Sequence, residues 1–116
     1  MPSPKIESYE FGRIVIDGRR YSSDVIIYPD HVDSGWRREE GHSLTLADVW
    51  DAVQISPEVL VIGQGNMGRM DVPAETRRQL QAAGLEVIAE PTGRACETYN
   101  QLRGKRRVVA ALHLTC

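Results

Sequence analysis

The sequence predicts an α/β fold: a three-layer domain with a central, mostly parallel mixed sheet, helices, and an N-terminal β-hairpin layer. Strand-like and helix-like patterns alternate through the second half of the chain, which favours parallel strands joined by right-handed crossovers. Two stretches in that half, residues 59–62 and 108–114, are continuously apolar, as expected of strands covered on both faces. The first half carries a hairpin signal instead.

The N-terminal part, residues 6–30, is predicted to be β-structure. The pair Asp17-Gly18 lies between the β-forming stretches 14–16 and 19–21, and such a pair is typical of a tight hairpin turn with positive φ at both central residues. A further strand at 25–28 ends at Pro29. The hairpin is expected to extend the central sheet or to pack over it. Residues 30–43 are polar and are predicted to be irregular.

Three helices are predicted in the second half, each from an apolar face with helical spacing. The inward-facing residues are expected to be Leu46, Val49, Trp50 and Val53 in the first; Val72, Thr76, Leu80 and Ala83 in the second; and Ala95, Tyr99 and Leu102 in the third. Pro73 and Gly84 mark the ends of the second helix, and Pro91-Thr92 opens the third. A strand at 85–89 separates these two helices.

Length and composition indicate one soluble α/β domain covering residues 1–116. The net charge of −2 gives no long-range attraction to nucleic acid or to an anionic membrane, and no apolar run is long enough to span a bilayer. The N-terminus has no apolar stretch typical of a signal peptide. Two cysteines, Cys96 and Cys116, do not make a disulfide framework, so a cytoplasmic location is expected.

The segment Gly63-Gln64-Gly65-Asn66-Met67-Gly68 spells G-x-G-x-x-G after a predicted strand, which is the pattern of a dinucleotide-binding turn. In that motif the helix opens inside the glycines, whereas here it is predicted to begin only at Pro73, so no cofactor is predicted. Two interpretations remain. The loop needs glycine for its backbone angles, or it binds a small anionic or polar ligand where the strand ends.

The widest concave site is expected where this loop meets the start of the next helix, at Thr92. Carboxyl ends of adjacent parallel strands leave a crevice in which ligands bind. The candidate ligand-binding residues there are Gly63, Gln64, Gly65 and Thr92.

Trp36 and His42 flank the irregular segment and complete the list of candidate ligand-binding residues. The favoured interpretation is that Trp36 anchors the loop to the core, as large aromatic side chains usually do. The alternative places both residues at the mouth of the pocket, where histidine could transfer protons.

His113 and Cys116 lie close to each other in sequence but form a poor chemical pair. Residues three apart on an extended strand point to opposite faces, and a zinc site needs three or four ligands. No metal site and no catalytic residue is therefore predicted. Cys96 is expected to be a small buried hydrophobe, and His113 a hydrogen-bonded core residue.

Nearly the whole chain resembles a small family that includes the adipogenesis-associated protein and the mitochondrial complex I assembly factor. The resemblance rests on these segments: Phe11-Gly12, Tyr21-Ser22-Ser23-Asp24-Val25, Trp36, His42, Leu60-Val61-Ile62-Gly63-Gln64-Gly65, Pro91-Thr92, Ala95, Tyr99-Asn100, Arg106-Arg107-Val108 and His113-Leu114-Thr115-Cys116. It implies a three-layer α/β domain with an N-terminal β layer and no established reaction. Without a presequence, a mitochondrial role does not carry over.

The function predicted from these observations is a non-catalytic binding or assembly module. The alternative is an enzyme that acts on a small polar substrate through His42, His113 or Cys116. The expected partners are proteins, or a small anion or metabolite, and not nucleic acid or membrane; self-association is left open.

Overall fold

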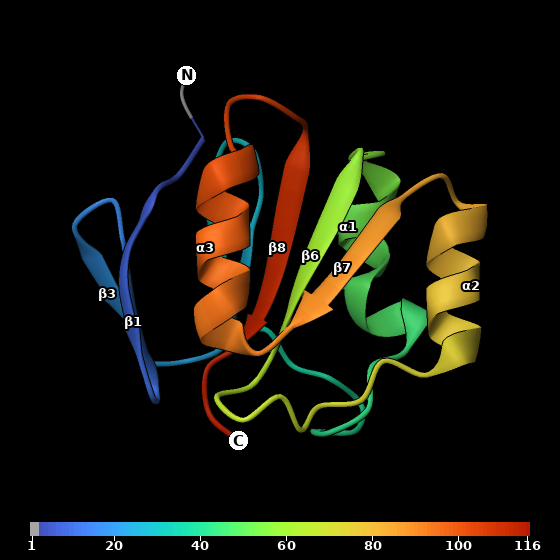
Figure 1. The fold of residues 1–116 in the computed structure, drawn as a ribbon, viewed down its shortest axis with the longest axis horizontal. Coiled ribbons are helices and arrows are strands. Elements are labelled where there is room, and N and C mark those ends of the chain that lie inside the picture. Colours follow the sequence, from blue (N-terminus) through green and yellow to red (C-terminus); the bar gives the residue numbers. More distant parts are fainter. Residues whose placement is uncertain (1–2) are drawn as a thin grey trace.

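The computed structural model describes residues 3–116 and contains two β-sheets and three α-helices. The three-stranded sheet consists of β1 (Ile6–Glu10), β2 (Arg13–Ile16) and β3 (Arg19–Tyr21), in that order. The five-stranded sheet has the order β5-β4-β8-β6-β7 (Figure 1). Its strands are β4 (Val25–Ile27), β5 (Val32–Ser34), β6 (Val59–Gln64), β7 (Glu86–Glu90) and β8 (Val108–His113).

The central sheet is mixed, as predicted. Strand β6 pairs in parallel with both β7 and β8, so the continuous apolar runs do form adjacent parallel strands. Strand β4 pairs antiparallel with β8 on one side and with β5 on the other. Strand β5 lies in the segment predicted to be irregular. The sequence does not reveal this strand, because Val-Asp-Ser has no apolar alternation.

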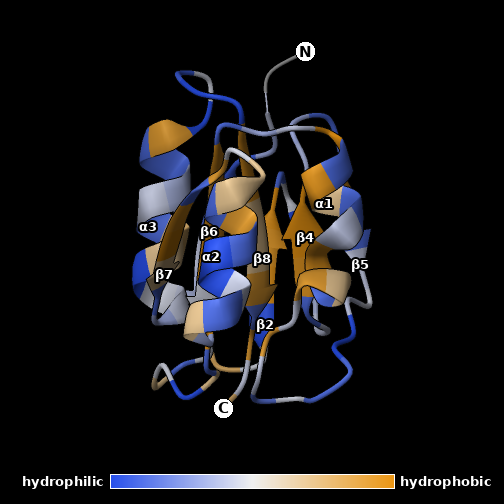
Figure 2. Ribbon diagram, turned by 90° about the vertical axis from the view of Figure 1, so that its right-hand side faces the viewer, coloured by the Kyte–Doolittle hydropathy of each residue, from blue (hydrophilic) through white to orange (hydrophobic). Residues whose placement is uncertain are grey.

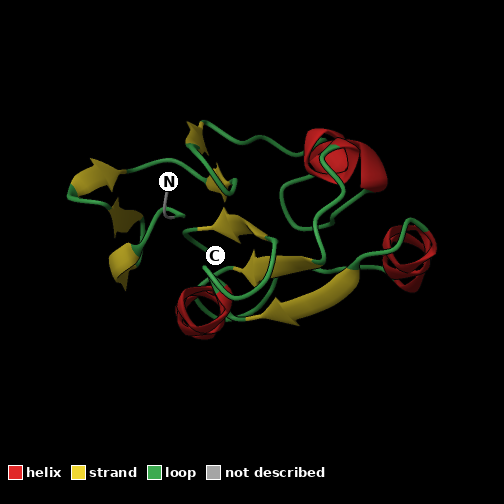
Figure 3. Cartoon of the chain, turned by 90° about the horizontal axis from the view of Figure 1, so that it is seen from above, coloured by secondary structure: helices red, strands yellow, loops and turns green. Residues whose placement is uncertain are grey.

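Helices and the small sheet cover the central sheet on both faces (Figure 3). One face packs against α3 (Thr92–Leu102) and the three-stranded sheet, through a core that includes Ile14, Tyr99 and Leu112. The other face packs against the 3-10 helix η1 (Leu46–Val49), α1 (Trp50–Gln54) and α2 (Ala74–Ala82). The predicted three layers are therefore present, and the hairpin packs over the central sheet instead of extending it.

The hairpin turn and strand β8 form where the local sequence patterns predict them. Asp17 and Gly18 have φ of 49° and 78°, so both turn residues adopt the left-handed conformation that the Asp-Gly pair favours. Strand β8 is the middle strand, and all six of its residues are buried; Figure 2 shows it and β4 as the hydrophobic centre of the fold.

Trp50 is predicted to face the core, but this prediction is wrong, because its side chain is 50% exposed. The predicted helix is divided into η1, which has 3-10 geometry, and a short α1 that begins at Trp50. In a 3-10 helix, residues three apart lie on the same face, as Leu46 and Val49 do. Trp50, the next residue, is therefore turned about 120° away from that face. No helix of the described residues is long and apolar enough to cross a membrane.

Candidate functional site

The glycine loop that follows β6 is tied to its surroundings by its own backbone. The Gly65 amide donates to Thr92 Oγ1 at 2.9 Å, and the Thr92 amide donates back to the Gly65 carbonyl at 2.9 Å. The Asn66 amide donates to the Thr115 carbonyl at 2.8 Å. Thr92 is fully buried and donates its hydroxyl proton to the His113 carbonyl at 2.5 Å. The polar groups expected to meet a ligand are thus bonded within the protein.

The glycines of this loop are explained by close packing. A Cβ at position 63 would lie 2.9 Å from both Leu112 Cδ2 and Thr92 Oγ1, which leaves no room for a side chain. Gly65 has a φ of +93°, and a Cβ there would lie 2.7 Å from the Thr115 carbonyl oxygen. Helix α2 begins only at Ala74, so no helix N-terminus meets the glycines as a dinucleotide site requires.

Replacing Gly65 by valine should destabilise the protein by at least about 2 kcal/mol, because the β-branched residue must adopt a strained φ and meets the Thr115 carbonyl. The measurement is the midpoint of urea unfolding. Gly18→Val, at φ +78° with nothing within 4 Å of its Cβ, is the matched control for backbone strain alone. Equal losses in the two variants would show that packing around Gly65 contributes nothing.

A buried ionic cluster lies beside the loop, at the end of β8. Asp24 Oδ2 accepts a hydrogen bond from Arg38 Nη1 at 3.0 Å and lies 2.8 Å from His113 Nδ1, and Asp24 Oδ1 accepts from the Leu114 amide at 2.8 Å. The side chains of Arg38 and His113 are 5% and 9% exposed. Three segments far apart in the sequence meet at this carboxylate, which therefore fixes their positions relative to one another.

His113 Nδ1 has two polar neighbours in the cluster. It lies 2.8 Å from Asp24 Oδ2, to which an N–H can donate, and 3.1 Å from Arg38 Nη2, from which a bare nitrogen can accept, and the tautomer sets which of these hydrogen bonds forms. His113 Nε2 is buried and has no hydrogen-bond partner among the described residues. The His42 ring lies edge-on, with its centroid 6.2 Å from that of His113. His113 is hydrogen-bonded in the core, as predicted, and His42 lies beside it.

Trp36 anchors the irregular segment, as the favoured interpretation predicts. Its side chain is buried, its Nε1 donates to the Asp48 carbonyl at 2.8 Å, and its amide donates to the Asp24 carbonyl at 2.9 Å. The Arg38 guanidinium carbon lies 4.6 Å from the centroid of the indole ring, within the range of a cation–π interaction. Trp36 therefore joins the ionic cluster to η1.

The two cysteines are free, and Cys96 lacks the environment of a nucleophile. Cys96 is buried on α3, and burial, followed by the nearby Glu97 carboxylate, raises its thiol pKa to about 12. A thiol with this pKa is protonated at neutral pH and is a poor nucleophile. Cys116 is exposed at the end of the chain.

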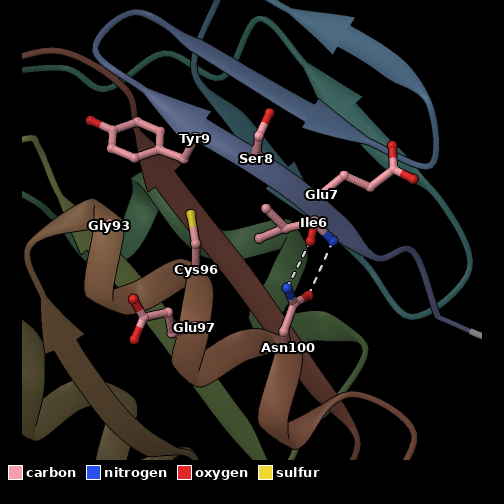
Figure 4. Close-up of a pocket in the computed structure, with 8 residues that line it drawn as sticks. All are labelled: Ile6, Glu7, Ser8, Tyr9, Gly93, Cys96, Glu97 and Asn100. Atoms are coloured by element: carbon pink, nitrogen blue, oxygen red, sulfur yellow. Dashed lines mark hydrogen bonds between the residues drawn. The ribbon is translucent and has the colours of Figure 1, made fainter.

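A first concave site, here called the edge groove, lies between β1 and α3 and has a volume of about 290 Å³ (Figure 4). Its lining residues are Ile6, Glu7, Ser8, Tyr9, Gly93, Cys96, Glu97 and Asn100. Cys96 projects from α3 toward β1, beneath Tyr9. Burial raises the pKa of Tyr9, and its hydroxyl donates to the Leu114 carbonyl at 3.0 Å.

A second concave site, here called the aromatic groove, lies on the opposite face of the central sheet and has a volume of about 360 Å³. Its lining residues are Ile26, Tyr28, Asp33, Gly35, Trp36, Arg37, Ala47, Asp48, Trp50 and Asp51. Burial, then the Asp51 and Asp33 carboxylates, raise the pKa of Tyr28, so both carboxylates act on its hydroxyl. Of the predicted site residues, only Trp36 lines this groove.

The structure thus brings Gly63, Gly65, Thr92 and His113 together, whereas neither groove includes any residue of the glycine loop. Gln64 is also near this group, and its Nε2 donates to the Met70 carbonyl at 3.0 Å. The sequence patterns do not mark Asp24 or Arg38 as site residues, although Asp24 lies in one of the segments that carry the family resemblance. These patterns also do not mark the carboxylates around Tyr28; the one available signal was the aspartates at 33, 48 and 51 beside three aromatic residues.

The fold and its two grooves define a small three-layer α/β domain with concave sites on opposite faces of a mixed sheet. Residues 6–113 match the model of the family described as a protein of unknown function (DUF498/DUF598). The chain belongs to this family. The more detailed likeness to the adipogenesis-associated protein and the complex I assembly factor stays a prediction.

Solved structures of similar proteins share the whole fold. A conserved hypothetical protein from Pyrococcus horikoshii is 30% identical, with a TM-score of 0.84 over 97% of this chain and 99% of that one. A Mth938-like domain from Bordetella pertussis is 26% identical, with a TM-score of 0.77 over 96% and 85% of the two chains. An outer membrane protein from Bartonella henselae is 24% identical, covers 99% and 98%, has a TM-score of 0.83, and shows the fold alone.

Proposed function

We propose that this chain is a non-catalytic binding module that holds a basic segment of a partner protein in the aromatic groove. The observation that carries the proposal is Trp50, a large indole that the fold leaves half exposed beside Asp51 in a concave site. Tryptophan is among the residues that most often dominate the energy of a protein interface.

The chemistry of the groove favours a cationic side chain. In the part of the chain that the structure describes, neither Asp33 nor Asp51 forms an ion pair, whereas the Asp48 carboxylate accepts from the Glu39 and Thr45 amides. Two carboxylates are therefore left to meet a cation next to Tyr28 and Trp50. Arg37 is the basic residue of the lining, and against Asp33, Asp48 and Asp51 it leaves the groove with a net negative charge. Arginine and lysine combine charge pairing with cation–π contact to an indole, so they suit this lining better than an anion would.

The state of the reactive groups supports binding over catalysis. The Asp24–His113 pair resembles a catalytic pair, but His113 Nε2 is buried where no substrate can reach it without rearrangement. The raised pKa of Cys96 keeps the thiol protonated. A cytoplasmic location is part of the same proposal, supported by the two free cysteines. A role in assembly of a larger complex is also part of it, supported by the half-exposed Trp50.

We place the ligand in the aromatic groove and not at the glycine loop. The Gly65 amide and the Thr92 hydroxyl are already bonded to each other and to β8, so an anion would have to displace internal hydrogen bonds. A cation can pair with the carboxylates of Asp33 and Asp51 without displacing an ion pair within the described residues.

The test uses a capped octapeptide of alternating arginine and glycine, titrated into the ¹⁵N-labelled protein. Saturable shifts of the Trp50 indole resonance are expected, and Trp50→Ala should weaken binding about 30-fold, the loss typical of a central interface residue. Asp51→Asn should weaken it about threefold, because the carboxylate is exposed and screened.

The matched controls separate charge from fold. The same peptide with citrulline in place of arginine keeps the shape and loses the charge, and it should not bind. Glu10→Gln removes an exposed carboxylate on the other face, outside the lining of both grooves, and should leave affinity unchanged. Equal binding of the two peptides, or full affinity in Trp50→Ala, would contradict the proposal.

A further inference from the structure

We infer that the edge groove is a second binding site, which takes an extended peptide segment of a partner protein as an added strand along β1. The inference does not use the aromatic groove, which lies on the other face of the central sheet. It rests on the part of the β1 edge beyond Ile6, which no strand of the described residues pairs with, on the way Asn100 bonds Ile6, and on the charge and shape of the groove.

Strand β1 is an edge strand. In the order β1-β2-β3 it has one neighbour, and among residues 3–116 no other strand pairs with it. Its outer edge is turned toward α3 instead of a further strand (Figures 1 and 4). The outer edge of such a strand is a template for hydrogen bonds to another chain, and natural proteins either cover it or use it for recognition.

Asn100 shows that the edge of β1 is bonded in the way a strand would bond it. Its Oδ1 accepts from the Ile6 amide at 3.1 Å, and its Nδ2 donates to the Ile6 carbonyl at 2.7 Å. A side-chain carboxamide has the same donor and acceptor as a peptide group, so Asn100 reproduces a one-residue strand pairing. It closes the edge at Ile6, and the groove continues beyond this point along Ser8 to Tyr9 (Figure 4).

The helix leaves space opposite that part of β1. Gly93 presents no side chain, and a Cβ built on it meets only the Tyr9 ring, at 3.9 Å. Cys96 contributes a small, protonated, apolar side chain to the lining. The volume of about 290 Å³ is at the lower limit of ligand clefts, which suits two or three small residues in extended form.

The rims of the groove select the charge of the segment. Glu7 lies on the β1 side and Glu97 on the α3 side, and both are exposed. The lining contains no lysine or arginine, and in the described range neither glutamate forms an ion pair. Glu7 Oε1 accepts a hydrogen bond from the Gly18 amide at 2.7 Å, so Glu7 contributes a long-range negative charge, while the Glu97 carboxylate can meet a cation directly. A segment with small residues at its centre and a basic residue at each end therefore complements the groove, and a free C-terminal carboxylate does not.

The experiment titrates a capped Lys-Val-Ala-Val-Lys peptide into the ¹⁵N-labelled protein and compares it with the same peptide N-methylated at both valines. N-methylation keeps every side chain and the charge but removes the backbone donors that strand addition needs. The unmodified peptide should shift the Ser8 and Tyr9 amides, and the methylated one should bind at least about tenfold more weakly, because two backbone hydrogen bonds are lost.

A protein variant tests the same site from the other side. Gly93→Leu fills the groove at a helical position with a good helix former, so binding should be lost while the melting temperature is kept or raised. Trp50→Ala should bind the pentapeptide like the parent, which distinguishes this site from the aromatic groove.

Three results would overturn the inference. The first is equal affinity for the two peptides, which needs no variant to be folded. The second is peptide shifts that map to Trp50 instead of β1. The third is a concentration-dependent shift of the Ser8 and Tyr9 amides without peptide, because that would assign the edge to a second copy of this chain.

Discussion

Val109→Asp should leave the chain unfolded at 25 °C. Val109 is fully buried in β8, the middle strand of the central sheet, and packs in the core that α2 and η1 close. An ionised carboxylate without a partner costs several kcal/mol at such a site, and its protonation costs a similar amount at neutral pH. This loss, added to the missing valine packing, is of the order of the whole stability of a domain, about 5–15 kcal/mol.

Circular dichroism and the dispersion of the amide spectrum measure this effect. Ala82→Asp introduces the same carboxylate at an exposed position on α2 and should remain folded with nearly unchanged stability. A dispersed spectrum and a parental melting temperature in Val109→Asp would remove β8 from the core.

The elements that the sequence predicted are those whose signal is local. Strand β8 follows from an unbroken apolar run, and the β2–β3 hairpin follows from Asp17-Gly18, whose conformational preference acts within two residues. Strand β5 has no such signal. It forms because the edge of β4 offers hydrogen bonds, with Val25 opposite Ser34 and Ile27 opposite Val32.

The candidate site was less predictable for the same physical reason. The glycine loop was found because a motif is contiguous, but the motif did not reveal that the C-terminal Thr115 carbonyl packs against Gly65. The ionic cluster joins Asp24 to residues 14 and 89 positions away, and no periodicity relates them. A 3.6-residue period predicts that Trp50 faces the core, whereas the segment that precedes it adopts the 3-10 period, which turns Trp50 outward.

Asp24→Asn should destabilise the protein by about 3 kcal/mol, which corresponds to a fall in melting temperature of roughly 12 °C for a domain of this size. The substitution leaves the Arg38 guanidinium, 5% exposed, without the carboxylate that neutralises it. The new amide group also places a donor or a weaker acceptor against the two donors Arg38 Nη1 and the Leu114 amide, next to His113 Nδ1. Removing one member of a buried ion pair typically costs more than the pair contributes.

A double-substitution cycle separates that charge penalty from the loss of hydrogen bonds. Arg38→Met in the Asp24→Asn background removes the buried cation and should restore part of the lost stability, although each single change is destabilising. Asp33→Asn removes a carboxylate on β5 that has no ion-pair partner in the described residues, and it should change the free energy of unfolding by less than about 0.5 kcal/mol. If the stability losses of the two single variants simply add in the double variant, Asp24 and Arg38 do not act as one cluster. In that case His113 and the segment around Trp36 would be held by packing and backbone bonds, and the buried charge of Asp24 would not be what joins β8 to the loop.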